Sequence, residues 1–190
     1  MRIPVGHWLF GDFPPFPKTV EYLDNAFRYA EKYNIKILID LHTAPGSQNG
    51  YDHSGLADEV NWHKNPKNIS QTLNILEKIS QRYCKENSLL GISLLNEPHI
   101  DIPIELLEEF YIEGYKRVRK YCNENVSVII SDSFRPYECW KIMQSPEFIN
   151  IILDIHFYQC FYDVNKNKEI EIVIKEMKEE WRRVIKIIQR

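Results

Sequence analysis

Apolar runs of strand length alternate with amphipathic helical patterns along the chain, and this alternation restricts the fold more than any other feature. Five runs are typical of strands: RIPVGHWLF (2–10), KILIDLH (36–42), LLGISLLNE (89–97), VSVIISD (126–132) and NIILDIHFY (150–158). Each is followed by a loop and a helical pattern. Strands that alternate with helices are joined by right-handed crossovers and form a parallel sheet. The sequence therefore predicts an α/β fold with five strand–helix units.

The helical patterns consist of apolar residues that recur three or four positions apart. They predict helices over 19–33, 69–83 and 103–121, a short helix near Cys139, and a long helix from Glu169 onward. Periodicity does not distinguish an open doubly wound sheet from a closed barrel. No glycine-rich phosphate-binding motif follows the first strand, so the dinucleotide-binding form of the open sheet is disfavoured.

The composition is that of a globular domain without a strong charge bias. The 190 residues are 44% hydrophobic and 27% charged, and the formal net charge is −3. This balance predicts no nucleic-acid partner. It also predicts no membrane association, because no apolar stretch approaches the roughly 20 residues of a membrane-spanning helix. The first residues do not form an export signal, and the compartment stays undecided.

The cysteines and histidines lack the spacing of a metal site. Cys84, Cys122, Cys139 and Cys160 lie far apart, without a C-x-x-C pair, and the six histidines include no His-x-x-x-His. Such spacing argues against zinc and gives no reason to expect disulfides. We expect no metal, no cofactor, and reduced thiols that are mostly buried.

Hydrogen-bonding side chains stand at the carboxyl ends of four predicted strands. They are His42, Asn96, Glu97, Ser131, Asp132, His156, Tyr158 and Gln159. Active sites of parallel α/β proteins, and of (β/α)8 barrels above all, are built at this edge. The pattern therefore predicts a functional site at the carboxyl ends of the strands.

Glu97 stands out among these residues because it ends a buried run and precedes Pro98. Proline biases the residue before it toward extended torsions, so we expect an extended Glu97 at the rim of the sheet. Burial there would raise the pKa of its carboxyl, as a positioned proton donor requires. A plain ion pair with a cation such as Arg2 is the alternative.

Five segments, RIPVGHW, DLHTAPGSQNGYDHSG, LLNEP, SDSFRPYECW and HFYQCF, follow one another in this order. Together they resemble glycoside hydrolase family 5, particularly its exo-1,3-β-glucanase branch near the cellulases. The resemblance implies a (β/α)8 TIM barrel, a retaining mechanism and a β-glucan substrate, β-1,3-glucan being favoured. Residues 1–190 would form one partial catalytic domain.

The resemblance also implies roles for individual residues. Glu97 would be the general acid/base, Asn96 would hydrogen-bond the sugar 2-hydroxyl, and Arg2 would support the carboxylate of the nucleophile. His156 and Tyr158 would lie beside that nucleophile. The residues expected to bind substrate are His42, Phe134 and Phe161, with Trp8, Gln48, Asn49 and Gln159 as weaker candidates. Taken singly, each of these could be an ordinary packing or ion-pairing residue.

A retaining glycosidase needs a second carboxyl group about 5 Å from the first. In the family that nucleophile ends the seventh strand, and the five runs correspond to strands two to six. Glu179, Glu180 and Trp181 imitate the nucleophile motif but lie inside a helical pattern, so we reject them. We expect the chain to be a truncated barrel that is inactive alone, with open sheet edges that permit self-association.

Two other functions stay open at this point. The chain could be a non-catalytic remnant that binds β-glucan through its aromatic cleft, or a non-functional truncated product. Binding of laminari-oligosaccharides without product release would favour the first, and aggregation with non-cooperative melting the second.

Overall fold

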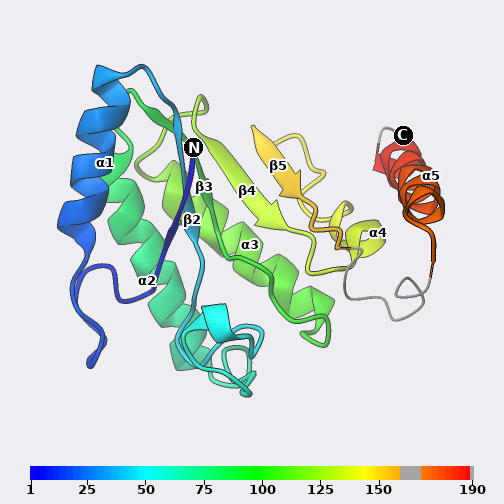
Figure 1. Ribbon diagram of the computed structural model, residues 1–190. Coiled ribbons are helices and arrows are strands. Elements are labelled where there is room, and N and C mark those ends of the chain that lie inside the picture. The colour runs from blue at the N-terminus through cyan, green and yellow to red at the C-terminus, as the bar shows by residue number, and fades with distance from the viewer. Residues whose placement is uncertain (159–167, 189–190) are drawn as a thin grey trace.

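The computed structural model describes residues 1–158 and 168–188 and contains one parallel sheet, with strand order β1-β2-β3-β4-β5 (Figure 1). The strands are β1 (Arg2–Val5), β2 (Ile37–Leu41), β3 (Leu89–Ser93), β4 (Ser127–Ser131) and β5 (Ile151–Asp154). The helices are α1 (Val20–Lys32), the 3-10 helix η1 (Asp52–Ser54), α2 (Pro66–Tyr83), α3 (Ile104–Arg119), α4 (Pro136–Cys139) and α5 (Ile170–Ile188). The predicted strand–helix alternation and parallel sheet are confirmed.

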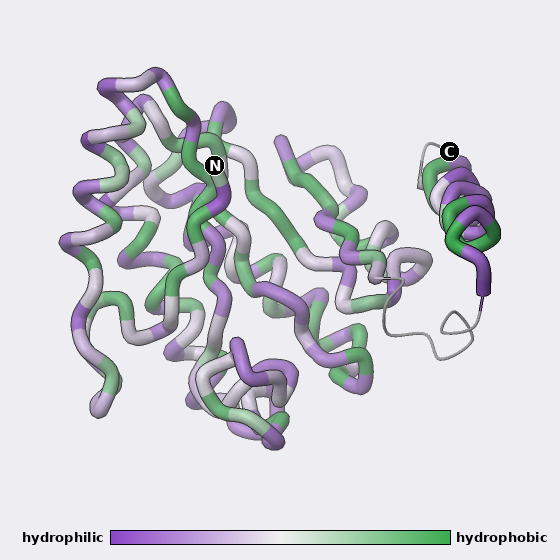
Figure 2. The backbone as a smooth tube through the Cα atoms, viewed as in Figure 1, coloured by the Kyte–Doolittle hydropathy of each residue, from purple (hydrophilic) through white to green (hydrophobic). Residues whose placement is uncertain are grey.

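Helices α1, α2 and α3 lie on one side of the sheet and bury its apolar side chains (Figure 1). Ile39 of β2, Ile92 of β3 and Val128 of β4 are neighbours in register, and each is fully buried. The helices also contact one another, because Phe27 of α1 stacks on Tyr83 of α2 with 4.7 Å between ring centroids. Hydrophobic residues gather along the strands and the inner sides of these helices (Figure 2).

The strands are shorter than predicted, and α2 is longer. β1 ends at Val5 because the chain turns there, with the Leu9 N–H donating to the Gly6 carbonyl over 3.0 Å. Helix α2 begins at Pro66 instead of Ile69, since the side chain of Asn65 accepts a hydrogen bond from the Lys67 N–H. Apolar periodicity does not predict the positions of caps and turns of this kind.

The cysteine prediction is wrong for one pair. Cys84 at the end of α2 and Cys122 after α3 form a disulfide, with Cα atoms 4.9 Å apart. They are 38 residues apart in the sequence, and only the packing of α2 against α3 brings them together. Cys139 is a free buried thiol, as predicted, and Cys160 lies outside the described residues.

Helix α5 stands apart from the sheet and contacts the chain near α4 (Figure 1). The Tyr137 hydroxyl donates to Glu180 over 2.8 Å, and Trp181 lies edge-on to Phe157 with ring centroids 5.1 Å apart. The helical placement of Glu179, Glu180 and Trp181 is confirmed. Across the described residues, no helix has the length and hydropathy to cross a membrane.

Candidate active site

The backbone at Glu97 adopts a left-handed conformation, with φ of 44°. The expectation that Pro98 would hold Glu97 extended is therefore wrong. The chain leaves β3 after Ser93, and the Asn96 N–H still donates to the Leu41 carbonyl over 2.9 Å. The Asn49 side-chain amide then donates to the Glu97 carbonyl over 2.9 Å and fixes the turn. This left-handed turn leaves the Glu97 side chain with 7% exposure at the carboxyl end of the sheet.

The two carboxylate oxygens of Glu97 have different partners. Oε1 lies 2.5 Å from Nδ1 of His156 and accepts a hydrogen bond from the Tyr158 hydroxyl over 2.9 Å. Oε2 lies 3.4 Å from Nε2 of His53 on η1. The structure thus brings together three of the predicted site residues, Glu97, His156 and Tyr158, and adds His53.

Charge states in this group differ from the prediction. Burial raises the pKa of Glu97, but the hydrogen bonds from His156 and Tyr158 outweigh burial, and the net shift is downward. The hydrogen bond to Asp154, followed by the one to Glu97, raises the pKa of His156 to about 9. The expectation of a raised Glu97 pKa is wrong, because at neutral pH the described residues favour a carboxylate beside an imidazolium.

Arg2 joins three strands across the side of the sheet that faces away from α1, α2 and α3. Its Nε donates to Asp40 of β2 over 3.0 Å, and its Nη1 donates to Asp154 of β5 over 2.8 Å. Its Nη2 donates to Oδ1 of Asn96 over 2.8 Å. A contact between the first and last strands requires a curled sheet. The expected ion pair of Glu97 with a nearby cation is made by His156 and not by Arg2.

Asp40 and Asp154 each stand two residues before a histidine of the site. His42 Nδ1 lies 2.8 Å from Asp40, and His156 Nε2 lies 3.1 Å from Asp154. Side chains two apart on a strand share a face, so the repeated Asp-x-His spacing was the signal that could have identified both carboxylates. Burial raises the pKa of Asp40, but hydrogen bonds from His42 and Arg2 outweigh burial and lower it overall.

The remaining predicted site residues differ in their contacts, and two of them lie outside the described residues. Asn49 is buried, and its side-chain amide forms hydrogen bonds with backbone groups of Glu97 and Tyr51. The weaker candidate Gln48 is likewise buried and donates to the His42 and Asn96 carbonyls. Two predicted aromatic residues have the following contacts: the Phe134 N–H donates to Asp132, and the Trp8 ring stacks on Phe16. Gln159 and Phe161 lie outside the described residues.

Asp132, at the end of β4, is a further buried carboxyl near this group. Its Oδ1 accepts from the Phe134 N–H over 3.2 Å, and its Oδ2 has no partner among the described residues. Burial raises the pKa of Asp132 to about 6. Asp132 supports the loop after β4, where Ser133 and Phe134 both have positive φ.

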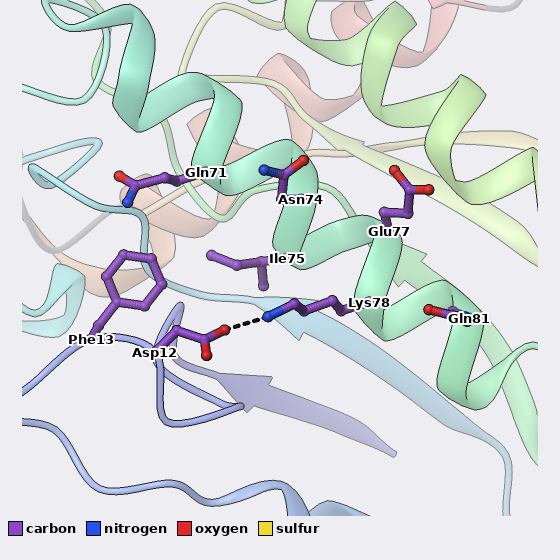
Figure 3. Close-up of a pocket in the computed structure, with 8 residues that line it drawn as sticks. All are labelled: Asp12, Phe13, Gln71, Asn74, Ile75, Glu77, Lys78 and Gln81. Carbon is purple, nitrogen blue, oxygen red and sulfur yellow. Dashed lines mark hydrogen bonds and ion pairs between the residues drawn. The ribbon is translucent and has the colours of Figure 1, made fainter.

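A separate hollow of about 390 Å³ lies between the loop after β1 and the outer side of α2 (Figure 3). Asp12 and Lys78 form an ion pair at its edge, beside Phe13. None of the side chains around Glu97 lines this hollow. Within the described residues, no group of three or more His, Cys, Asp or Glu side chains is arranged to hold a metal ion.

Comparison with known proteins gives one consistent result. The family model described as cellulase (glycosyl hydrolase family 5) matches residues 1–189. A glucan 1,3-beta-glucosidase of Schwanniomyces occidentalis is 40% identical over 169 residues, which cover 85% of this chain and 39% of that protein. One from Pichia angusta is 36% identical over 185 residues, covering 90% and 41%. The chain thus spans about two fifths of the length of these relatives.

Solved structures agree at the level of the fold. The rutinosidase from Aspergillus niger superimposes with a TM-score of 0.71 at 22% identity, covering 83% of this chain and 49% of that one. Thermotoga maritima Cel5A in complex with cellobiose gives a TM-score of 0.69 at 21% identity, covering 99% and 63%. The predicted fold class, an incomplete barrel of the (β/α)8 type, is confirmed.

Proposed function

The chain belongs to glycosyl hydrolase family 5, and we propose that it carries the acid/base half of a retaining β-glucan hydrolase. β-1,3-Glucan is the favoured substrate, because relatives that are 40% and 36% identical are named glucan 1,3-beta-glucosidase. The observation that carries the proposal is the Glu97 carboxylate, which is held by His156 and Tyr158 at the carboxyl ends of the strands.

In this proposal Glu97 first gives its proton to the glycosidic oxygen as the bond from that oxygen to the anomeric carbon breaks. It then takes a proton from the water that releases the glycosyl-enzyme intermediate. Asn96 contributes a directed donor, because its Oδ1 is taken by Arg2 and its Nδ2 has no partner within the described residues. His42 and Trp8 would contact the sugar, together with Phe134, Gln159 and Phe161.

The second carboxyl group of the reaction is not assigned to β1–β5. Asp154 is linked to Glu97 through His156, but its Oδ2 already accepts from Arg2 and His156. We therefore propose Asp154 as a supporting group and not as the nucleophile. The five strands described here would bind glucan but would not complete the double displacement. Their outer edges, on β1 and β5, are proposed surfaces for self-association.

The test replaces Glu97 with glutamine in the protein as its gene encodes it. We expect kcat on laminari-oligosaccharides to fall by about 10²–10⁴, the usual contribution of a general acid/base. Hydrolysis of a 2,4-dinitrophenyl β-glucoside should fall less in its first step, because that leaving group needs no proton. Glu109→Gln, on the exposed side of α3, is the control. Equal activity of Glu97→Gln and the control would reject the proposal.

A second function is favoured by the lowered pKa of Glu97. A carboxylate beside an imidazolium is a poor proton donor at rest, and this state suits a glucan-binding protein without hydrolysis. Isothermal calorimetry with laminaribiose, followed by a glucose assay on the same sample, separates the two functions. Binding without glucose release from the protein as encoded would favour the second.

A further inference from the structure

The two oxygens of Glu97 are not equally free to exchange a proton. Oε1 already accepts from His156 and Tyr158, and a carboxylate oxygen has two lone pairs. The oxygen left to carry a transferable proton is Oε2. Among the described residues, His53 forms an ion pair with Oε2, with Nε2 at 3.4 Å.

His53 lies between Glu97 and solvent. Its side chain is 40% exposed, against 7% for Glu97. The rings of His42 and Tyr51 flank it, with centroids 4.9 and 5.7 Å away. No hydrogen bond joins His53 Nδ1 to a described residue, so this nitrogen is available to water or a ligand.

The position of His53 is set by the loop and does not depend on Glu97. The hydroxyls of Ser47 and Ser54 are 2.6 Å apart and fully buried, and the Ser54 hydroxyl also lies 2.7 Å from the Tyr51 carbonyl. Gly55, with φ of 87°, ends η1 directly after these residues. These hydrogen bonds fix the backbone that carries His53, and a side chain on a fixed turn is placed to orient a neighbouring group.

From this arrangement we propose that His53 is a positioning residue for the acid/base: it directs Oε2 of Glu97 outward and links that oxygen to solvent. The proposal rests on the proposed function of Glu97 and extends it. Three titratable groups face the carboxyl group of Glu97: His156 and Tyr158 from the segment after β5, and His53 from η1. His156 and Tyr158 hold Oε1, and His53 serves the oxygen that exchanges the proton.

The test follows the titration of the Glu97 side-chain carboxyl by ¹³C NMR in the 190-residue chain. The nearby His53 lowers the pKa of Glu97, so His53→Leu should move the Glu97 midpoint upward. His53→Gln is polar but cannot become charged either, and should move the midpoint in the same direction. His99→Leu is the matched control, because His99 lies 3.5 Å from the exposed Asp101. An unchanged Glu97 midpoint in His53→Leu and His53→Gln would overturn the proposal.

The outcome separates this proposal from the proposed function. A shifted midpoint, combined with no β-glucoside hydrolysis by the protein as its gene encodes it, would support the coupling of His53 to Glu97 and reject the hydrolase. Loss of hydrolysis in Glu97→Gln would support the hydrolase. The role of His53 would be rejected if the His53 variants changed neither the Glu97 midpoint nor the pH–rate profile.

Discussion

Side chains on the two faces of the sheet differ in chemistry. On the face covered by α1, α2 and α3, Ile39, Ile92 and Val128 form a fully buried apolar row. On the opposite face, Asp40 is equally buried, but it is paired with Arg2. Apolar rows stabilise through burial alone, whereas a buried charge requires its partner. The comparison teaches that the polar face depends on specific pairs and tolerates the loss of one partner poorly.

The largest effect should come from the polar face. Arg2→Met leaves Asp40 buried without its guanidinium partner, and we expect a loss of about 4 kcal/mol in the free energy of unfolding. Asp40→Asn should lose less, because the Arg2 side chain is 33% exposed and can be hydrated. Urea unfolding measures both. Equal losses of unfolding free energy in Arg2→Met and Asp40→Asn would contradict the comparison. The predicted difference between them follows from the deeper burial of Asp40.

A slightly smaller effect is expected on the apolar face. Leu94 is fully buried and lies against Gly114 of α3. Leu94→Ala should cost about 3 kcal/mol through lost burial and the cavity left behind. Ile100→Ala is the control, because Ile100 is 46% exposed. A Leu94→Ala loss below that of the control would show that this face is not a packed core.

The disulfide stabilises the helices of the apolar face. Reduction of Cys84–Cys122 removes a covalent link between the ends of α2 and α3, and we expect a loss of about 2 kcal/mol. Differential scanning calorimetry with and without dithiothreitol measures the change. The Cys84→Ala and Cys122→Ala variants should no longer respond to the reductant, and a response in either would show that another thiol is involved.

Counted per pH unit, the smallest effect on the free energy of unfolding comes from His156, and it sharpens the comparison through pH. The pKa of His156 is raised to about 9 in the folded state, so its protonated ring stabilises that state. This stabilisation is complete below pH 6.5 and is lost as pH rises through about 9. Between these values unfolding should become easier by about 1.4 kcal/mol for each pH unit. His156→Gln should remove this slope, whereas Leu94→Ala should lower stability by the same amount at every pH. A slope retained in His156→Gln would place its origin elsewhere.

The apolar face could be predicted from the sequence, and much of the polar face could not. Continuous apolar runs predicted the bounds of β2 and β4 to within one residue, because the apolar pattern of a buried strand depends only on neighbouring residues in the sequence. Glu97 was identified by its place at the end of such a run, but its left-handed turn depends on the Asn49 amide, 48 residues away in sequence.

The same limit explains the other differences. The disulfide depends on how α2 packs on α3, and the role of Arg2 depends on the curl of the sheet. The lowered pKa of Glu97 depends on two side chains that follow β5. Asp40 and Asp154 are the exception, because their shared Asp-x-His spacing is visible in the sequence.

The positive φ of Glu97 also bears on why a glutamate stands at this position. Left-handed backbone suits glycine, asparagine and aspartate better than glutamate, and holding another residue there costs on the order of 1 kcal/mol. Substitution for folding alone would thus tend to replace the glutamate with one of those residues. The proposed acid/base role would account for a glutamate at this strained position, at some expense to the resistance of the chain to unfolding.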